Sequence, residues 1–374
     1  MIIARTIETK LEKSLFLGKI VVIYGARQVG KTTLVKKILE KYPQDSIYLN
    51  CDEPDIRAAL TNKTSTELKS FIGSNRLVVI DEAQRVNNIG LTLKLIADNF
   101  PDIQIIATGS SSFELSGKIA EPLTGRKTEF FLYPLSVAEL SQIFSPLEID
   151  RLLEERLVFG MYPGVVFSGQ EKEQRVRELA TSYSYKDVLA YQDIRNPELL
   201  EKLLQALALQ VGSEVSYNEL ARLLGVNKAT VENYIRILEQ AYIIFRVGPF
   251  SRNLRNELKR MRKIYFYDLG LRNALINNLN PVSLRSDVGA LWENFLVSER
   301  IKRNNNNGVI TNNYYWRTTG GKEIDLVEDS GGVLTGFKFK WLKENFTPPQ
   351  EFLSVYQGSS IKLVNRKKYL DFLS

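Results

Sequence analysis

The chain has 374 residues, more than a single hydrophobic core usually supports, so two or three domains are expected. It contains no histidine, which removes the commonest general base and metal ligand, and its one cysteine, Cys51, excludes a disulfide within the sequence. No apolar run has the length of a signal peptide core or a membrane span, so we expect a cytoplasmic protein without membrane contact.

The first motif in chain order is a glycine-rich phosphate-binding loop. Residues 25–32 read Gly-Ala-Arg-Gln-Val-Gly-Lys-Thr and match GxxxxGK[ST] at every fixed position. The apolar run Ile20 to Tyr24 predicts a strand before the loop, and Thr33 to Tyr42 predicts a helix after it. Backbone N–H groups of such a loop close around a triphosphate, and the helix N-terminus adds its partial positive charge.

Each position of the loop thereby acquires an expected role. Lys31 is predicted to reach the β- and γ-phosphates as a catalytic residue, and Thr32 to hold Mg²⁺. The residues predicted to contact the nucleotide are Gly25, Ala26, Arg27, Gln28, Val29, Gly30, Lys31, Thr32 and Thr33 in the loop, with Thr108 and Ser110 further along the chain.

A second motif supplies acidic groups. The apolar run Leu77 to Ile80 is typical of a strand buried on both faces, and Asp81-Glu82 follows it directly. We assign Asp81 to the Mg²⁺ ion and Glu82 to the attacking water.

Further strands are predicted at Ser46 to Asn50, Ile103 to Thr108 and Glu129 to Leu132. Helical stretches lie between them, and this alternation favours an α/β fold with a parallel sheet wrapped by helices. The strand ending at Thr108 leads into Gly109-Ser110-Ser111-Ser112, at the edge where such sheets bind ligands. Thr108 or Ser110 could sense the γ-phosphate there; a polar turn that merely leaves the sheet is the equally open alternative.

The segments GARQVGKTTL, LVVIDEAQ and IIATGSSS, in this order, resemble the AAA-type P-loop ATPases of bacteria and archaea. Within this class the chain resembles the family that joins an AAA domain (AAA_14) to a C-terminal domain of unknown function, DUF4143. The later segments that carry this resemblance are Met161 to Gly164, Lys263 to Leu271, Tyr315 to Arg317 and Glu323 to Asp325. The resemblance implies an AAA-like P-loop fold, with ATP as the nucleotide and Mg²⁺ as its metal.

The same resemblance marks Leu123-Thr124-Gly125-Arg126 as a recurrent element. It implies that Arg126 is a candidate arginine finger, stabilising charge on the γ-phosphate of its own subunit or of a neighbour's in a homo-oligomer. A surface arginine after a glycine turn is the alternative.

A helix-turn-helix pattern lies at residues 216–240. Ser216 to Glu219 reads as a capping box, and Asn227 can cap a second helix over Lys228 to Gln240 that buries Val231, Ile235 and Leu238. The apolar run Tyr242 to Val247 suggests a winged form. The side chains expected to be available to nucleic acid on the second helix are Lys228, Thr230, Asn233, Tyr234 and Arg236.

The net charge of +7 is unevenly placed. A basic run that could neutralise phosphates makes double-stranded DNA a candidate partner through residues 216–263. A solvated surface, or a winged helix used for packing or dimerisation, is the alternative. The run consists of Arg252, Arg255, Lys259, Arg260, Arg262 and Lys263.

Between the sheet and this module, Ser136 to Glu139 forms another capping box, and the chain to about Leu209 is expected to be mainly helical. We interpret this stretch as a lid and connector that transmits the nucleotide state to the winged helix. Asn304 to Asn307, before Gly308, is expected to be an exposed turn.

The C-terminal part resembles the restriction-endonuclease-like fold. A helix beginning at Gly289 carries Glu293, and predicted strands carry Asp325 and Lys340, which match that fold's metal-binding and lysine positions. The glutamate of its E-x-K pair is replaced by Lys338, whose positive charge would repel a divalent cation. We therefore expect a nuclease-like fold without ordinary nuclease activity, although Glu323 could substitute because it shares a strand face with Asp325.

The predicted organisation has four parts: an AAA-like P-loop ATPase domain at 1–145, a helical lid and connector at 146–209, a winged-helix domain at 210–278 and a restriction-endonuclease-like DUF4143 domain at 279–374. The function expected is that of an ATP-binding, ATP-hydrolysing protein whose nucleotide state controls DNA-associated C-terminal modules. Two alternatives stay open: an ATP-gated, metal-dependent DNA nuclease, and a non-catalytic nucleotide-sensing scaffold that binds protein.

Overall fold

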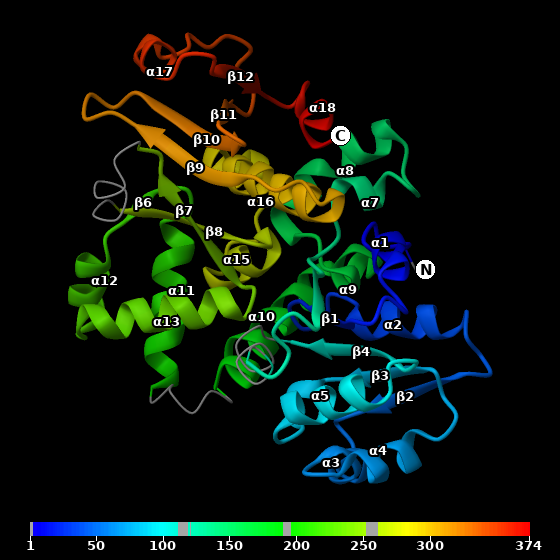
Figure 1. Cartoon of the computed structure of the whole chain (residues 1–374). Coiled ribbons are helices and arrows are strands. Elements are labelled where there is room, and N and C mark those ends of the chain that lie inside the picture. Colours follow the sequence, from blue (N-terminus) through cyan, green and yellow to red (C-terminus); the bar gives the residue numbers. More distant parts are fainter. Residues whose placement is uncertain (1–2, 111–118, 120, 190–195, 252–260) are drawn as a thin grey trace. The chain divides into compact units, whose positions relative to one another are not determined.

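The computed structural model describes residues 3–110, 119, 121–189, 196–251 and 261–374, with the backbone alone for 182–189. The chain divides into two compact units (Figure 1). The N-terminal unit ends at Tyr133 and also takes in Gln240–Tyr242. The C-terminal unit comprises Pro134–Glu239 and Ile243–Ser374.

The N-terminal unit is built on a five-stranded sheet in which all neighbouring strands run parallel. Three of its strands are buried along their whole length, as continuous apolar runs predict. The predicted strands are confirmed, two of them with the expected bounds. In spatial order they are β2 (Ser46–Asn50), β3 (Leu77–Asp81), β4 (Gln104–Gly109), β1 (Ile20–Tyr24) and β5 (Lys127–Phe131).

Helices connect these strands. The helix after the phosphate loop begins at Lys31, two positions before the start we predicted at Thr33, because Gly30 adopts a left-handed conformation (φ 99°) directly before it. The helices of this unit are α1 (Glu8–Lys13), α2 (Lys31–Leu39), α3 (Pro54–Leu60), α4 (Ser65–Ile72), the 3₁₀ turn η1 (Ala83–Arg85) and α5 (Ile89–Asn99).

The C-terminal unit contains a seven-stranded mixed sheet. Its two halves join where β7 and β9 pair in parallel, with Gly248 opposite Tyr314. Strands from residues 214–266 and 312–364 therefore share one sheet, while the four-part division of the chain stays a prediction. In spatial order the strands are β12 (Ser360–Val364), β11 (Val333–Phe339), β10 (Glu323–Ser330), β9 (Asn312–Arg317), β7 (Ile244–Pro249), β8 (Arg262–Phe266) and β6 (Glu214–Val215).

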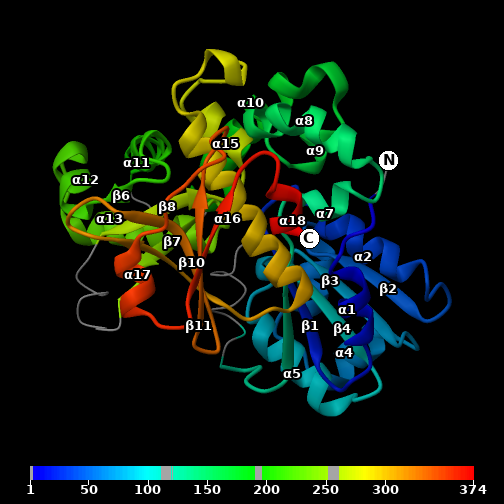
Figure 2. The same cartoon turned by 90° about the horizontal axis from the view of Figure 1, so that it is seen from above.

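Helices of this unit surround the sheet, and α16 packs against β8 and β11 (Figure 2). The described residues between 136 and 209 are mainly helical, as expected. Within the described part of the chain, no helix combines the length and apolar character needed to cross a bilayer. The helices are α7 (Val137–Leu140), α8 (Pro146–Phe159), α9 (Pro163–Val166), η2 (Gly169–Glu171), α10 (Lys172–Leu189), α11 (Pro197–Leu209), α12 (Tyr217–Leu224), α13 (Lys228–Gln240), α15 (Leu269–Leu275), η3 (Val282–Leu284), α16 (Val288–Asn307), α17 (Gln350–Val355) and α18 (Tyr369–Leu373).

The helix pair α12 and α13 has the caps that the sequence predicts. Ser216 accepts a hydrogen bond from the Glu219 N–H, and Asn227 Oδ1 accepts one from the Thr230 N–H at 2.8 Å. The prediction that Tyr234 is available to nucleic acid is wrong, because its side chain is only 5% exposed. Tyr234 lies three positions after the buried Val231, on the apolar face of α13.

The prediction of an exposed turn at Asn304 to Asn307 is also wrong. These residues form the last turn of α16, which ends at the left-handed Gly308. Asn304 and Asn306 are buried, and the Asn304 amide donates to Glu328 Oε1 on β10 at 2.9 Å. This tertiary acceptor stabilises a polar run that would favour a turn in isolation.

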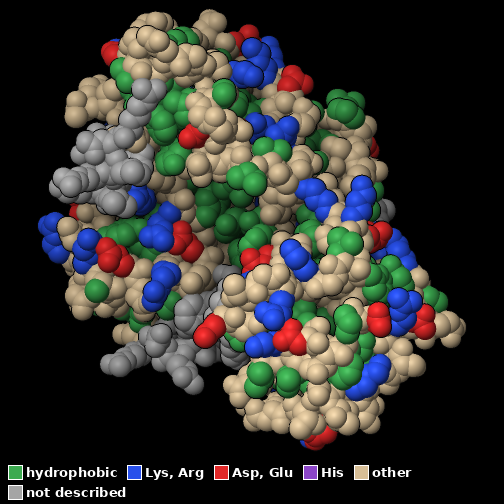
Figure 3. Space-filling model, viewed as in Figure 1, with side chains coloured by type: hydrophobic (Ala, Val, Ile, Leu, Met, Phe, Trp, Pro, Cys, Tyr) green, Lys and Arg blue, Asp and Glu red, His purple; other side chains and the backbone are tan. Residues whose placement is uncertain are grey.

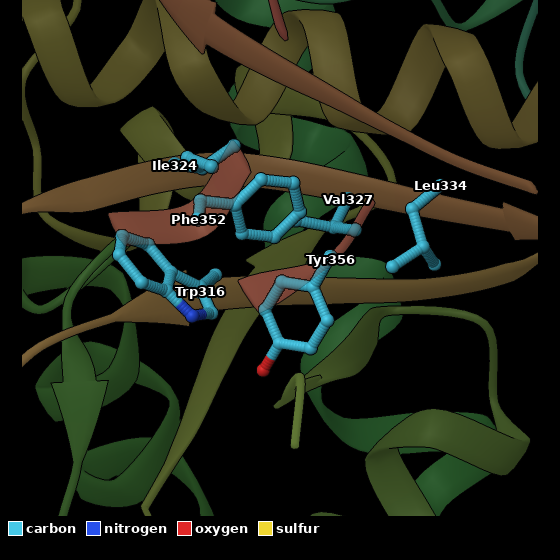
Figure 4. Packing of buried hydrophobic residues seen from close by; sticks show 6 residues of the cluster. All are labelled: Trp316, Ile324, Val327, Leu334, Phe352 and Tyr356. Carbon is cyan, nitrogen blue, oxygen red and sulfur yellow. The ribbon is translucent and has the colours of Figure 1, made fainter. Parts of the chain in front are cut away.

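An apolar cluster fixes α17 on the sheet (Figure 4). The Trp316 and Phe352 rings meet edge to face with centroids 5.3 Å apart, and the Phe352 and Tyr356 rings are 4.8 Å apart. The sheet side of the cluster is thus joined to the helix by aromatic contacts. Its buried members are Trp316, Ile324, Val327, Leu334, Phe352 and Tyr356.

Asp268 connects two segments of the C-terminal unit that are distant in sequence. Its carboxylate caps α15 by accepting from the Leu271 N–H at 3.0 Å, and it accepts from the Met161 N–H at 2.6 Å. A side chain on Gly160 would collide with it, since an ideal Cβ there would lie 2.2 Å from Asp268 Oδ1. This buried carboxylate therefore holds the turn after α8 against the start of α15.

Replacing Asp268 by alanine should lower the free energy of unfolding by about 2 to 4 kcal/mol, because the helix cap is lost and a buried N–H is left without an acceptor. Urea denaturation followed by circular dichroism measures the change. Asp371→Ala, at an exposed position of α18, is the control and should leave stability nearly unchanged. Equal midpoints for the two variants would contradict the role given to Asp268.

Candidate functional site

The phosphate loop occupies the turn between β1 and α2. Gly25 must lack a side chain, because an ideal Cβ would lie 2.1 Å from the Leu132 carbonyl oxygen. Ala26 and Val29 are buried, whereas Gln28 is exposed and left-handed (φ 59°). Part of the predicted loop is therefore packed into the unit, and part of it faces outward.

Lys31 lies at the first position of α2 and is only 5% exposed. Its ammonium donates to the carbonyl oxygens of Gly25 and Ala26, at 2.8 and 2.9 Å. The cation is thus held within the loop, where a phosphate oxygen would compete with these neutral carbonyls and, being charged, would form the stronger hydrogen bond. Thr33, which is also predicted to contact the nucleotide, is exposed.

Asp81, at the carboxyl end of β3, is 2% exposed and accepts hydrogen bonds from hydroxyl groups. Its Oδ2 accepts from Thr32 Oγ1 at 2.7 Å and from the Tyr48 hydroxyl at 2.6 Å, and its Oδ1 accepts from Thr108 Oγ1. The structure therefore brings together Thr32, Asp81 and Thr108, as predicted. A hydroxyl and a carboxylate supply the oxygen ligands that Mg²⁺ prefers, so these residues fit the expected metal.

Glu82 follows in the left-handed conformation (φ 53°), which turns the chain out of the strand. Its N–H donates to Thr108 Oγ1 at 3.0 Å. Its carboxylate accepts from the Gln84 side chain at 2.5 Å, and the same amide nitrogen donates to Ser110 Oγ at 3.1 Å. Glu82, Thr108 and Ser110 thus lie close together at the ends of β3 and β4.

Two residues of this network were missed by the sequence analysis. Gln84 is part of the LVVIDEAQ segment, but nothing in its spacing showed that its amide connects Glu82 to Ser110. Tyr48 lies on β2, which is a neighbour of β3 in space but not in sequence. Burial raises the pKa of Tyr48, and the hydrogen bond to Asp81 and its charge raise it further, so the phenol stays a donor.

Arg126 lies away from this network. It precedes the amino end of β5, where its carbonyl accepts from the Ile20 N–H, and its side chain donates to Asp98 at 2.8 Å. Because β5 and β1 are parallel, this is the edge of the sheet opposite the phosphate loop. The structure does not bring Arg126 to the loop of its own subunit, and a role in a neighbour's site stays a prediction. Ser111 and Ser112 lie outside the described residues.

Replacing Gln84 by leucine, of similar size, should lower the turnover number for nucleoside triphosphate several-fold with little change in KM, because Glu82 loses the amide that orients it. Steady-state kinetics over a range of nucleotide concentrations measures both constants. Ser110→Ala, which removes the other acceptor of that amide, serves as the comparison. Unchanged turnover in Gln84→Leu would show that Glu82 needs no such support.

A second group of charged side chains lies in the C-terminal unit, at the predicted nuclease-like positions. The carboxylates of Glu293, Glu323 and Asp325 surround two lysine ammonium groups. Lys263 Nζ lies 2.8 Å from Glu293 and 2.6 Å from Glu323, and Lys338 Nζ lies 2.6 Å from Asp325 and 3.6 Å from Glu323. The predicted carboxylates are thus brought together, and lysines lie among them.

The groups of this cluster alter each other's protonation. Burial raises the pKa of Glu293 to about 7, and the charge of Asp325 adds to the effect against the opposing charge of Lys263. Burial also raises the pKa of Asp325. Burial alone would lower the pKa of Lys263, but the charges of Glu293, Glu323 and Asp325 raise it, so its ammonium stays protonated.

The lysines occupy the position that a cation would need. Lys338 stands in place of the E-x-K glutamate and faces Asp325, as the charge argument predicts, whereas Lys263 on β8 was missed because it comes from a distant strand. The backbone N–H of Lys340 donates to the Val364 carbonyl oxygen at 3.1 Å. Among the residues that the structure describes, no three or more acidic or cysteine side chains are arranged to hold a metal ion between them.

The stability of the protein should depend on the protonation of Glu293. Its native pKa of about 7 lies above the value of 4.5 expected in the unfolded chain, so the native state binds more protons between these values. Its stabilising contribution is therefore complete below pH 4.5 and is lost as the pH rises through 7. Chemical denaturation at intervals across this range should show a flatter pH profile for Glu293→Gln than for the wild type; parallel profiles would contradict the assignment.

A groove of about 600 Å³ lies beside the helix pair of the C-terminal unit, lined by α12, α13, β7 and β8. Its basic residues are Lys228, Arg236, Arg246 and Arg262. Acidic partners moderate this charge: Lys228 pairs with Glu232 at 3.0 Å and Arg246 with Glu239 at 2.5 Å. Figure 3 shows basic and acidic side chains interspersed over this part of the surface.

Only part of the predicted basic run falls within the described residues. Arg252, Arg255, Lys259 and Arg260 lie outside the described residues. Arg262 lines the groove, whereas Lys263 is buried in the carboxylate cluster and is only 2% exposed. The run is therefore not a single exposed surface.

The parallel sheet, the glycine-rich loop after β1 and the acidic pair after β3 define a P-loop nucleotide-binding fold in the N-terminal unit. Comparison with protein families agrees: residues 17–141 match an AAA domain (AAA_14), 150–282 match a domain of unknown function (DUF8612) and 288–367 match a domain of unknown function (DUF4143). The expected combination of an AAA_14 domain with a C-terminal DUF4143 domain is confirmed.

The relatives found are uncharacterized proteins. The chain is 28% identical over 321 residues to MJ1544 of Methanocaldococcus jannaschii, covering 80% of this chain and 70% of the relative. It is 27% identical over 341 residues to Rv2008c of Mycobacterium tuberculosis, covering 90% and 73%. Among solved structures, a match is found to the structure of Drosophila ORC bound to GC-rich DNA and Cdc6, with 11% identity over 73% of this chain and 90% of that chain. Its TM-score of 0.26 is too low to show a shared fold.

Proposed function

We propose that this protein is an AAA-type ATPase, in which the N-terminal unit binds and hydrolyses ATP and the nucleotide state controls C-terminal modules that bind double-stranded DNA. The observation that carries the first half is the hydrogen-bonded set around Asp81, which joins Thr32 of the phosphate-loop helix to Thr108 of β4. The sequence motifs are thus also neighbours in space, at the edge of the sheet where parallel α/β folds bind ligands.

Each residue has a task in this proposal. The loop amides and Lys31 would hold the phosphates, and Thr32 and Asp81 would hold Mg²⁺, which when bound would neutralise phosphate charge. Glu82 accepts a hydrogen bond from the attacking water and aligns it with the γ-phosphate, while Gln84 orients the Glu82 carboxylate. Thr108 and Ser110 are the residues that would sense the presence or loss of the γ-phosphate.

We assign Arg126 to a neighbouring subunit's site, because its own sheet separates it from the loop. The working form is then a homo-oligomer, in which the arginine finger is supplied in trans. The absence of an apolar span in the sequence supports our inference of a cytoplasmic protein.

We assign α12, α13 and the strands β7 and β8 to a winged helix. The turn lengths, the caps at Ser216 and Asn227 and the antiparallel pair that follows α13 support this assignment. Its groove offers two exposed cations of α13, Lys228 and Arg236, to a phosphate backbone.

The nuclease alternative is disfavoured by the lysines of the carboxylate cluster. Lys263 and Lys338 already balance most of the negative charge of Glu293, Glu323 and Asp325, so a divalent cation would have to displace them. We infer that residues 279–374 form a restriction-endonuclease-like domain that has lost cleavage. The remaining alternative, a nucleotide-sensing scaffold, is decided by the measurement below.

The wild type should hydrolyse ATP with Mg²⁺, and DNA should change the rate. Glu82→Gln should bind ATP but lower turnover at least about a hundredfold, since the carboxylate that aligns the water is lost. Steady-state phosphate release is measured for both proteins, with and without duplex DNA. If neither protein turns over ATP in either condition, the scaffold alternative replaces this proposal.

A matched pair of variants connects the effect of DNA to the groove. Arg236→Ala removes an exposed groove cation, and Arg175→Ala removes an arginine of similar exposure on α10 that lies outside the groove. Arg236→Ala should weaken DNA binding and reduce its salt dependence by about one phosphate contact, whereas Arg175→Ala should not. Equal binding by both variants would remove the groove from the proposal.

A further inference from the structure

Arg5 contacts the phosphate loop from outside its motif. Its guanidinium donates through Nη1 to the Val29 carbonyl oxygen at 2.7 Å and through Nη2 to the Tyr133 carbonyl oxygen at 2.6 Å. All of these residues belong to the N-terminal unit. One planar side chain therefore bridges the phosphate loop and Tyr133, the second residue after β5.

The hydrogen bond to Val29 determines the direction of a loop amide. The peptide group between Val29 and Gly30 is planar and trans, so its C=O and N–H point in opposite directions. With the carbonyl held by Arg5, the Gly30 N–H points away from the guanidinium. Gly30 is left-handed, and an ideal Cβ on it would lie 3.7 Å from Arg5 Nη1, so the guanidinium lies close behind this turn of the loop.

Arg5 is itself held by the segment that follows it. Ile7 and Leu11 are buried, and Glu8 on α1 forms ion pairs with Lys37 at 2.8 Å and Lys41 at 3.6 Å. Lys37 belongs to α2, the helix that the phosphate loop begins. The guanidinium is therefore positioned relative to the same helix whose N-terminus would receive the phosphate.

The other arm of Arg5 holds the end of the N-terminal unit. Tyr133 is its last residue before the chain continues as Pro134 into the C-terminal unit. There the backbone is fixed by a buried pair on α16: Lys302 Nζ donates to the Leu135 carbonyl at 3.1 Å, and Glu299 accepts from the Val137 N–H at 2.7 Å. The segment 133–137 thus begins at an Arg5 contact and continues into contacts with α16.

We propose that Arg5 is a positioning residue that aims the Gly30 amide at the nucleotide phosphates and passes a shift of the phosphate loop to the backbone at Tyr133. This inference deepens the proposed function and depends on it, because it names the route by which nucleotide state leaves the ATPase unit. A guanidinium suits the role, since its fixed fork holds two acceptors in one plane.

The test compares Arg5→Ala and Arg5→Lys with Lys37→Ala, a control that removes one ion pair of Glu8 without touching the loop, while the pair with Lys41 and the buried Ile7 and Leu11 still hold α1. Calorimetry measures Mg-ATP affinity, steady-state kinetics measures KM and kcat, and hydrogen exchange follows residues 133–140 with and without nucleotide. Arg5→Ala should weaken ATP binding and raise KM about tenfold, with a smaller change in kcat, and should abolish the nucleotide-dependent protection of 133–140. Arg5→Lys should be intermediate, and Lys37→Ala should resemble the wild type.

The outcomes separate the two proposals. ATP binding by the wild type with equal affinity in Arg5→Ala and Lys37→Ala would overturn the role of Arg5 and leave the proposed ATPase intact. Unchanged exchange of residues 133–140 when the wild type binds ATP would overturn the coupling. Failure of the wild type to bind ATP would overturn both proposals. If Arg5→Ala does not fold, Arg5→Lys decides. The ammonium of a lysine lacks the planar fork of a guanidinium, so an ATP affinity of Arg5→Lys equal to that of the wild type would overturn the proposal.

Discussion

The N-terminal unit depends on the hydrogen bonds that satisfy one buried carboxylate, that of Asp81. A carboxylate that is 2% exposed must be satisfied by hydrogen bonds, since an unpaired buried charge is costly. Its donors come from α2, β2 and β4, and are the hydroxyls of Thr32, Tyr48 and Thr108. The phosphate-loop helix and neighbouring strands are thereby joined at the edge of the sheet where ligands bind.

The two acidic centres of the chain are compensated in opposite ways. Asp81 receives hydrogen bonds from neutral hydroxyls, so its negative charge stays available to a cation. Asp325 and its neighbour Glu323 face the ammonium of Lys338, so their charge is already balanced within the protein. The first arrangement fits an ion delivered with a nucleotide, whereas the second holds α16 and the C-terminal sheet together through buried ion pairs.

Polar contacts also link distant parts of each unit. In the N-terminal unit, Arg5 connects the segment before α1 to the phosphate loop and to Tyr133. In the C-terminal unit, Glu299 and Lys302 hold the backbone that follows Pro134. Because one partner in each of these hydrogen bonds is charged, their geometry is more restrictive than that of apolar packing, which suits positions where a small displacement must be transmitted.

The sequence by itself determined the features that depend on neighbours along the chain. The phosphate loop, the acidic pair at Asp81-Glu82 and the cap at Asn227 follow from spacing, strand-like apolar runs and helix-capping chemistry, all of which act over a few residues. The prediction for Tyr234 is wrong for an equally local reason, since three positions after Val231 the side chain lies on the apolar face of α13.

Only the tertiary structure decided which distant residues meet. Tyr48 reaches Asp81 because β2 lies beside β3, and Lys263 reaches Glu323 because β8 and β10 belong to one sheet. Arg126 is remote from the phosphate loop for the same kind of reason, since the parallel pairing of β5 with β1 sends it to the other edge. Strand order arises from long-range packing, and the local hydrophobic period of a chain does not encode it.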